Sequence, residues 1–360
     1  MKKFIAILLV AFVASLFTYS VGARPEKNTT SKETGYYDGL AAQLFIDRVF
    51  GAYAVLQDVA QVTPLIASPG SSADAIVFLK LESLQTTGSF KLRGAYYAVS
   101  RLNSEEKERG VVASSAGNHA QGVALAAREL GVKATIFIPE SAPQEKVNAT
   151  RSYGADVRVE GKNFTEAKAA AEEFIRQAGG VYIPPYDDVA VIAGQGTIAL
   201  EILRQMPDVE AVVVPVGGGG LLSGIAYTIK TLKPSCKVYG VEVEGMNGMQ
   251  LSLAAGKPIS VPVRETLADG IAVSAPSDLT FAISRNNVDE VVTVTEEQVA
   301  GAMLFLLNEH KLVVEGAGAV SVAAVKNKLL PLHGKKVICI VSGGNLSAQA
   351  LVRLIENRLP

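Results

Sequence analysis

Hydrophobic residues recur along most of the chain in two patterns, short apolar runs and longer segments with an apolar residue every three or four positions. The runs predict strands and the spaced segments predict helices. The predicted strands lie at 111–113, 134–138, 157–160, 211–216, 237–242 and 335–341. The predicted helices lie at 119–130, 144–153, 165–177, 221–232, 296–308 and 318–327, with a last helix running to 358. Strands that alternate with helices predict an α/β fold with parallel sheets and helices on both faces.

The first 23 residues follow a different pattern. Lys2 and Lys3 precede an apolar run at 4–17, and small residues at 21–23 occupy the positions that a signal peptidase reads. This composition predicts a signal peptide at 1–23 with cleavage after Ala23. Because the run is short for a transmembrane helix, we expect an exported chain, periplasmic or secreted, with no stable membrane span after processing. A membrane-anchored or a cytoplasmic protein is the alternative.

Composition limits the class of protein. A chain of 360 residues can bury a large core and divides most simply into two domains. Its 49% hydrophobic and 19% charged residues fit a core-rich α/β enzyme and exclude a disordered chain. The net charge is −1 and no basic run is interleaved with aromatic residues, which excludes nucleic acid as a partner. The two cysteines, Cys236 and Cys339, form neither a disulfide framework nor a zinc pattern.

One lysine, Lys91, lies between an extended run at 76–81 and a helical run that begins at Ala95. Gly88 and Gly94 flank it, so the backbone can turn tightly and approach a ligand closely. The start of a helix carries partial positive charge, which lowers the pKa of an amine placed there and suits a Schiff-base nucleophile. A solvated loop lysine would explain this position as well, so its role depends on motifs elsewhere in the chain.

A run of four glycines, Gly217 to Gly220, follows an apolar strand and begins a helix. Such a run lets successive backbone N–H groups converge on a phosphate at the positive end of the helix dipole. The G-x-G-x-x-G dinucleotide spacing fails, because its third glycine would fall at Leu222, and no Lys-Ser/Thr pair of a Walker loop follows. The run therefore predicts a loop that binds the phosphate of a different cofactor.

Four blocks in this order resemble the fold type II pyridoxal-phosphate (PLP) enzymes: 63–65 with 84–95, then 114–119, 215–220 and 341–345. The residues of these blocks most resemble the threonine/serine ammonia-lyase (threonine dehydratase) branch in its short form without a regulatory domain. This branch is related to serine racemase. The resemblance runs from about Val49 to the C-terminus. It implies a tryptophan synthase β-like fold with a large PLP-binding domain at 24–107 and 188–360 and a small domain at 108–187. PLP would lie between the two, at the carboxyl ends of strands.

The resemblance also implies the site. Lys91 would hold PLP as a Schiff base and act as general base. The residues expected to bind the cofactor are Phe90, Lys91, Asn118, Gly217, Gly218, Gly219, Gly220, Leu221, Glu315 and Ser342. The residues expected to bind the substrate carboxylate are Ser115, Ala116, Gly117, Asn118 and His119.

Individual roles follow from the same resemblance. Phe90 would pack on the pyridine ring, Asn118 would bind the ring hydroxyl, and Ser342 would face the ring nitrogen. Glu315 would lie near the ring. Each has a structural alternative: a core aromatic for Phe90, a helix N-cap for Asn118 and a carboxylate at the start of a helix for Glu315. For His119 we expect no chemistry.

The metal site of the racemase branch uses two carboxylates after the strand that ends here at Glu242. In this chain the second position is Gly248, so one hard anionic ligand remains and we expect no metal.

The implied reaction is PLP-dependent β-elimination of L-threonine, and secondarily L-serine, to 2-oxobutanoate or pyruvate and ammonia. The partner is then a small amino-acid substrate, and we expect a homo-oligomer. A serine or threonine racemase or another fold type II enzyme is the alternative, although the racemases use a serine where this chain has Ala116. A remote alternative is an exported, non-catalytic binder of amino acids or PLP.

Overall fold

The computed structural model describes residues 31–43 and 46–356. The signal peptide that we predict at 1–23 lies outside the described residues. Of the N-terminal unit, 1–34, only the first residues of helix α2 (Ser31–Ala41) are described.

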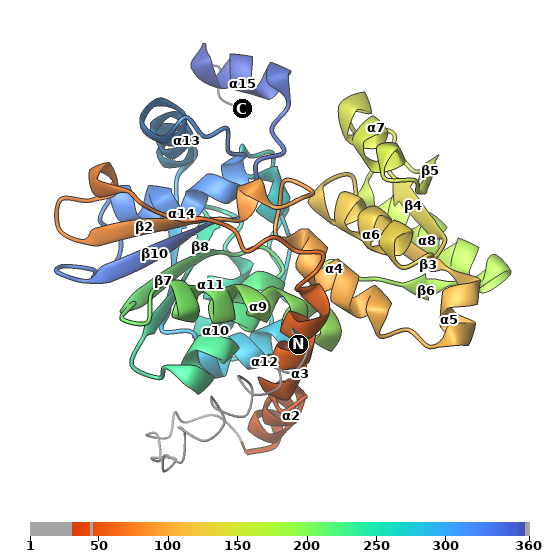
Figure 1. Ribbon diagram of the computed structural model, residues 1–360, viewed down its shortest axis with the longest axis horizontal. Coiled ribbons are helices and arrows are strands. Elements are labelled where there is room, and N and C mark those ends of the chain that lie inside the picture. The colour runs from red at the N-terminus through yellow and green to blue at the C-terminus, as the bar shows by residue number, and fades with distance from the viewer. Residues whose placement is uncertain (1–30, 44–45, 357–360) are drawn as a thin grey trace, which may run out of the picture. The chain divides into compact units, whose positions relative to one another are not determined.

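Two separate β-sheets organise the described chain (Figure 1). The larger sheet has the order β1 (Leu65–Ala67), β2 (Ile76–Leu81), β10 (Lys336–Val341), β7 (Ala211–Pro215), β8 (Lys237–Val243) and β9 (Glu290–Val294). The smaller sheet has the order β5 (Asp156–Val159), β4 (Ala134–Ile138), β3 (Val111–Ser114) and β6 (Val181–Tyr182). All four strands of the smaller sheet fall within 108–187, and all six of the larger sheet fall outside that segment.

The strands pair in parallel, as the alternation of strands and helices predicted, with one exception at an edge. Strand β1 pairs antiparallel with β2, with Leu65 opposite Lys80. Only a short connection containing the 3₁₀ turn η1 (Pro69–Ser71) separates these strands, and a parallel crossover needs a dozen residues or more. The predicted fold class is confirmed, with this antiparallel edge strand added.

The helices lie between and around the strands. Besides α2 they are α3 (Ile46–Leu56), α4 (Lys91–Ser100), α5 (Ser104–Arg109), α6 (Asn118–Glu129), α7 (Gln144–Ser152), α8 (Phe164–Ala178), α9 (Val189–Gln205), α10 (Gly220–Leu232), α11 (Gly248–Ala255), α12 (Asp278–Asn287), α13 (Glu296–His310), α14 (Gly316–Lys326) and α15 (Ala348–Ile355). The hydrophobic pattern did not predict α5, α9, α11 and α12, or the strands β1, β6 and β9. In α9, apolar residues on every side and two glycines obscure the helical spacing.

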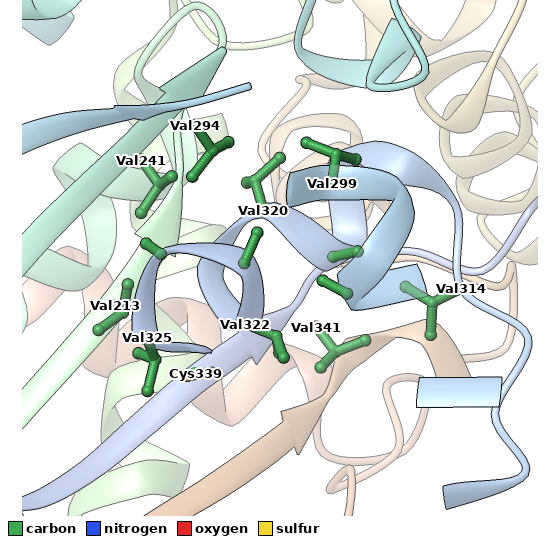
Figure 2. Close-up of a cluster of buried hydrophobic side chains, with 14 of the residues drawn as sticks. Val213, Val241, Val294, Val299, Val314, Val320, Val322, Val325, Cys339 and Val341 are labelled. Atoms are coloured by element: carbon green, nitrogen blue, oxygen red, sulfur yellow. The ribbon is translucent and has the colours of Figure 1, made fainter. Parts of the chain in front are cut away.

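Helices cover both faces of the larger sheet, and alternate residues of each strand point to opposite faces. Val213, Val241 and Cys339 belong to a cluster that includes residues of α13 and α14 (Figure 2). Their neighbours Val212 and Ile338 belong to a second cluster with α9 and α10. The smaller sheet is covered in the same way, by α6 on one face and α8 on the other.

Helices α4 and α9 approach each other unusually closely, and glycines allow it. A Cβ at Gly94 would lie 2.7 Å from Val191 O, and a Cβ at Gly194 would lie 2.6 Å from Arg93 O. Neither backbone oxygen can move away without disturbing its helix. The helix that carries Lys91 is therefore fixed against α9.

Four buried charged side chains form what we call the ion cluster: Lys80, Glu82, Arg93 and Glu201. Arg93 pairs with Glu82 at 2.8 Å and with Glu201 at 2.6 Å. Lys80 Nζ lies 2.6 Å from Glu201 Oε2, and Glu82 also accepts a hydrogen bond from Thr63 Oγ1 at 2.6 Å. Two cations thus face two anions, so the core contains no unpaired charge at this point.

One stretch near the N-terminus, Gly35–Leu56, is long and apolar enough to cross a membrane by length and composition alone. Within it, α3 buries Val49, Ala52 and Leu56, and Val49 packs with residues of α4 and α9. The stretch lies C-terminal to the predicted signal peptide and is separate from it.

Candidate active site

Lys91 is the first residue of α4, as its position between an extended and a helical run predicted. Its Nζ donates a hydrogen bond to Pro185 O at 2.8 Å and lies 5.2 Å from the centre of the Phe90 ring. The protein packed around the amine lowers the pKa of Lys91 to about 8, an effect that the nearby Glu315 carboxylate opposes. A larger fraction of this amine is therefore unprotonated near neutral pH than for a lysine in water.

The glycine run lies where the sequence placed it, between β7 and α10. Gly219 has φ +92°, a left-handed conformation that L side chains rarely adopt. A Cβ at Gly218 would lie 2.3 Å from the Tyr186 ring, and a Cβ at Gly220 would lie 2.8 Å from Tyr186 Cβ. The residue next to Pro185 therefore packs on the glycine loop, so one short segment contacts both the loop and the Lys91 amine.

Asn118 and Glu315 come together although 197 positions separate them. Asn118 Nδ2 donates to Glu315 Oε1 at 2.6 Å. Glu315 is 6% exposed, and burial, reinforced by the charge of Asp269, raises its pKa to about 7. Neither residue caps a helix with its side chain: Gly117 is the N-cap of α6, and Glu315 is the N-cap of α14 without a side-chain cap bond. The N-cap alternative for Asn118 was therefore wrong.

The remaining residues expected to bind the cofactor are Ser342, Phe90 and Leu221. Ser342 follows β10, and its Oγ donates to Ala317 O at 3.3 Å, while its backbone oxygen accepts from Phe90 N at 3.1 Å. Phe90 is partly buried at the edge of the core cluster on the α10 face. Leu221 is the second residue of α10 and its side chain is buried in that same cluster, so its backbone N–H is the group available for the expected role.

The segment 115–119 connects β3 to α6. Ser115 Oγ accepts a hydrogen bond from Gly117 N at 3.1 Å, so this hydroxyl is turned along its own loop. Ala116 offers only a methyl group. His119 is buried and its Nε2 bonds Ile183 O at 2.8 Å. Burial lowers the pKa of His119 to about 3, which keeps the ring neutral and suits a structural tie to the segment before Pro185.

Glu242 also has a structural explanation. Its two carboxylate oxygens accept from Met249 N at 2.9 Å and Gln250 N at 2.8 Å, at the start of α11. Burial raises its pKa to about 7 despite these bonds. Among the residues that the structure describes, no group of three or more His, Cys, Asp or Glu side chains could hold a metal ion.

Sequence reasoning missed three residues of this region: Pro185, Tyr186 and Asn345. The Pro184-Pro185 pair after a short apolar run signals a rigid break in the chain, but nothing in it indicates contact with a distant lysine. Asn345 ends one of the quoted blocks, and its Nδ2 donates to Asn118 Oδ1 at 2.7 Å. Its partner could not be inferred from spacing, since 227 positions separate the two asparagines.

The chain as a whole matches a known class of enzyme. The family model for "Pyridoxal-phosphate dependent enzyme" matches residues 56–343, and the chain belongs to this family. PLP is therefore its cofactor, and the resemblance inferred from the four sequence blocks is confirmed.

Relatives within the family are more specific. The chain is 54% identical to an L-threonine ammonia-lyase of Thermotoga maritima over 283 residues, covering 79% of this chain and 70% of the relative. Among solved structures, maize serine racemase has a TM-score of 0.83 at 34% identity, covering 87% of this chain and 97% of that one. The processed form of threonine deaminase isoform 2 from Solanum lycopersicum has a TM-score of 0.80 at 36% identity, covering 94% and 96%.

The residues present fit PLP. The first N–H groups of α10 have no acceptor within the helix and converge at the glycine loop, where a phosphate is favoured. A Cβ at Gly217 would lie 3.0 Å from Ile271 Cα, so the loop has no room for a side chain that would fill the cradle. The lowered pKa of Lys91 supplies the unprotonated amine that a Schiff base requires.

Glu315 gives a prediction for the stability of the apoprotein. Its folded pKa of about 7 exceeds the ordinary value of 4.5, so between these pH values the folded protein holds a proton that the unfolded chain releases. This contribution to the free energy of unfolding is complete below pH 4.5 and is lost as the pH rises through 7. Glu315→Gln cannot titrate there and should gain stability relative to wild type across this window, by about 3 kcal/mol.

Urea unfolding of both apoproteins across this pH range measures the difference. Other groups, such as Glu242, titrate in both proteins and cancel. The exposed Glu172, changed to Gln, is the matched control and should follow the wild-type curve. Parallel curves for wild type and Glu315→Gln would show that the Glu315 carboxyl is not held protonated.

Proposed function

We propose that this protein is an L-threonine ammonia-lyase that also accepts L-serine and produces 2-oxobutanoate or pyruvate with ammonia. The observation that carries the proposal is that Lys91 and the glycine loop meet at one segment, Pro185-Tyr186. A reactive amine thereby lies next to a phosphate cradle, the pairing that a PLP lyase needs. The identity to a threonine ammonia-lyase over most of the chain supports the substrate class.

The site residues would hold the cofactor in distinct ways. Gly217 to Gly220 and the N–H of Leu221 bind its phosphate, and Asn118 binds the ring hydroxyl. Ser342, a neutral hydroxyl, faces the ring nitrogen, and Phe90 packs against the ring. Bound PLP supplies the electron sink that makes the substrate α-proton acidic. A neutral partner such as Ser342 at the ring nitrogen would keep this electron sink moderate.

The chain's own acid–base groups complete the reaction. Lys91 is the covalent attachment point for the cofactor and, once released, its Nζ takes the proton from the substrate α-carbon. Its lowered pKa increases the fraction of the amine that is unprotonated and can accept that proton near neutral pH. The loop Ser115 to His119 holds the substrate carboxylate. There the N–H groups at the start of α6 favour an anion, whereas His119 acts through its structural bond to Ile183.

The same proposal includes the division into a large domain, 24–107 with 188–360, and a small domain, 108–187. The two separate sheets support this division, with the site at the carboxyl ends of β3, β7 and β10.

The proposal also includes a homo-oligomer, which light scattering of the purified protein tests directly.

Lys91→Ala tests the site assignment. We expect no turnover and no covalently retained PLP, because the Schiff base and the acceptor of the α-proton are the same amine, Lys91 Nζ. Ketoacid release from L-threonine is one measurement, and retention of PLP through denaturing gel filtration after borohydride reduction of the Schiff base is the other. The exposed Lys162, changed to Ala, is the matched control and should behave as wild type. Release of 2-oxobutanoate by Lys91→Ala at a rate near wild type would refute the assignment.

A racemase is the second candidate, because maize serine racemase shares the fold. Racemisation needs an acid–base group on each face of the α-carbon. Here the position that carries a serine in the racemases is Ala116, and the neighbouring Ser115 hydroxyl is turned toward Gly117 N. Ala116 therefore supplies no proton donor to the face opposite Lys91, and the bond from Gly117 N holds the Ser115 hydroxyl along its own loop.

Ala116→Ser restores that donor and should gain some racemase activity, while wild type should form ketoacid with little or no D-enantiomer. Chiral chromatography of the products from L-serine measures both, with Ala149→Ser on the neighbouring helix α7 as a control for the substitution. D-serine formed by the wild type as fast as pyruvate would overturn the lyase proposal.

We also propose that the chain is exported and that its mature form begins at Arg24. The support is the composition of residues 1–23: two lysines, an apolar run and small residues at 21–23. Expression with and without residues 1–23, followed by fractionation and N-terminal sequencing, tests this. An intact Met1 on protein from a soluble cytoplasmic pool of the native host would contradict export.

A further inference from the structure

Asn345 lies beside the proposed cofactor site and contacts two of the segments that build it. Its Nδ2 is 2.8 Å from Thr87 O and 2.7 Å from Asn118 Oδ1. Gly88 packs against the same side chain, since a Cβ there would lie 2.3 Å from Asn345 Oδ1. The backbone N–H of Gly344 donates to Gly88 O at 2.9 Å. Asn345 is thus fixed against the segment that leads to Lys91.

The hydrogen bonds determine which way each amide faces. A backbone carbonyl oxygen only accepts, so the atom of Asn345 that faces Thr87 O has to be the nitrogen. The second hydrogen of that nitrogen is directed at Asn118, so the facing atom there has to be Oδ1. Asn118 Nδ2 then points the other way and donates to Glu315 Oε1 at 2.6 Å. One backbone carbonyl therefore orients two amides in series.

We propose that Asn345 is a positioning residue that holds Asn118 Oδ1 and so keeps the Asn118 amide NH₂ directed at Glu315 and at the ring oxygen of PLP. The inference rests on the proposed role of Asn118 in binding that ring oxygen. Without Asn345 the Asn118 amide can turn over, and its oxygen would then face two other acceptors. The effect is exerted through Asn118, since Asn345 itself has both amide hydrogens occupied by protein oxygens.

Asn345→Asp is the sharpest variant, because it keeps the shape of the side chain and replaces the donor with a carboxylate. We expect the dissociation constant of PLP from the apoprotein to rise about tenfold, the size of one lost hydrogen bond. The absorbance maximum of bound PLP should also shift, because a different Asn118 atom faces the ring oxygen. Asn327→Asp is the matched control: its Nδ2 donates to Ala323 O at 2.8 Å on α14, and PLP affinity should not change.

A double-mutant cycle separates positioning from a direct or a general structural role. Asn118→Ala removes the group that Asn345 orients, so Asn345→Asp should cause no further loss of PLP affinity in that background. Losses of affinity that multiply in the double variant would overturn the proposal. So would an unchanged PLP dissociation constant in Asn345→Asp alone.

A second measurement needs neither bound PLP nor substrate. In the apoprotein, Asn345→Ala should speed hydrogen exchange of the Asn118 side-chain NH₂ several-fold by NMR, because its oxygen loses the fixed partner. An exchange rate equal to wild type would overturn the proposal even if Asn345→Asp fails to fold. If wild type binds PLP but releases no ketoacid from hydroxy amino acids, the proposed reaction fails, whereas the amide result still decides the role of Asn345.

Discussion

The pairing of Arg93 with Glu82 and Glu201 determines where the rest of the site can lie. Arg93 is buried two residues after Lys91, and its guanidinium joins η2 (Glu82–Leu84) to α9 through charge-assisted bonds of 2.6 and 2.8 Å. Removing one carboxylate would leave two buried cations facing one anion, which is strongly destabilising. The start of α4, and with it the Lys91 amine, is thereby held in one place relative to both neighbouring segments.

Burial tunes the two titratable groups of the proposed site in opposite directions. The pKa of Lys91 falls to about 8 and that of Glu315 rises to about 7, because in each case the charged form loses water. Both groups therefore change charge near neutral pH, the range in which an amine has to take up and release a proton. The hydrogen bond from Asn118 partly offsets the rise for Glu315 and links its charge to the orientation of the amide.

The fold alone does not choose between elimination and racemisation. A serine racemase and a threonine deaminase superpose on this chain with nearly equal scores, so the choice has to come from individual side chains. At Ala116 the loop offers a methyl group, which can neither give nor take a proton, and the adjacent Ser115 Oγ accepts a hydrogen bond from Gly117 N. The methyl group at Ala116 is the local feature on which the proposed lyase chemistry depends.

The sequence by itself determined what depends on neighbouring residues. The glycine run at 217–220 predicted a loop that leads into a helix, and the position of Lys91 predicted a helix start, since turns and helix ends are local features. Strand–helix alternation likewise determined the fold class. Only the tertiary structure decided which side chains meet: Lys91 with Pro185 and Asn345 with Asn118 lie 94 and 227 positions apart. Such contacts arise when the buried faces of different elements pack together. Hydrophobic periodicity predicts which face of an element is buried, but it does not identify the element that packs against that face.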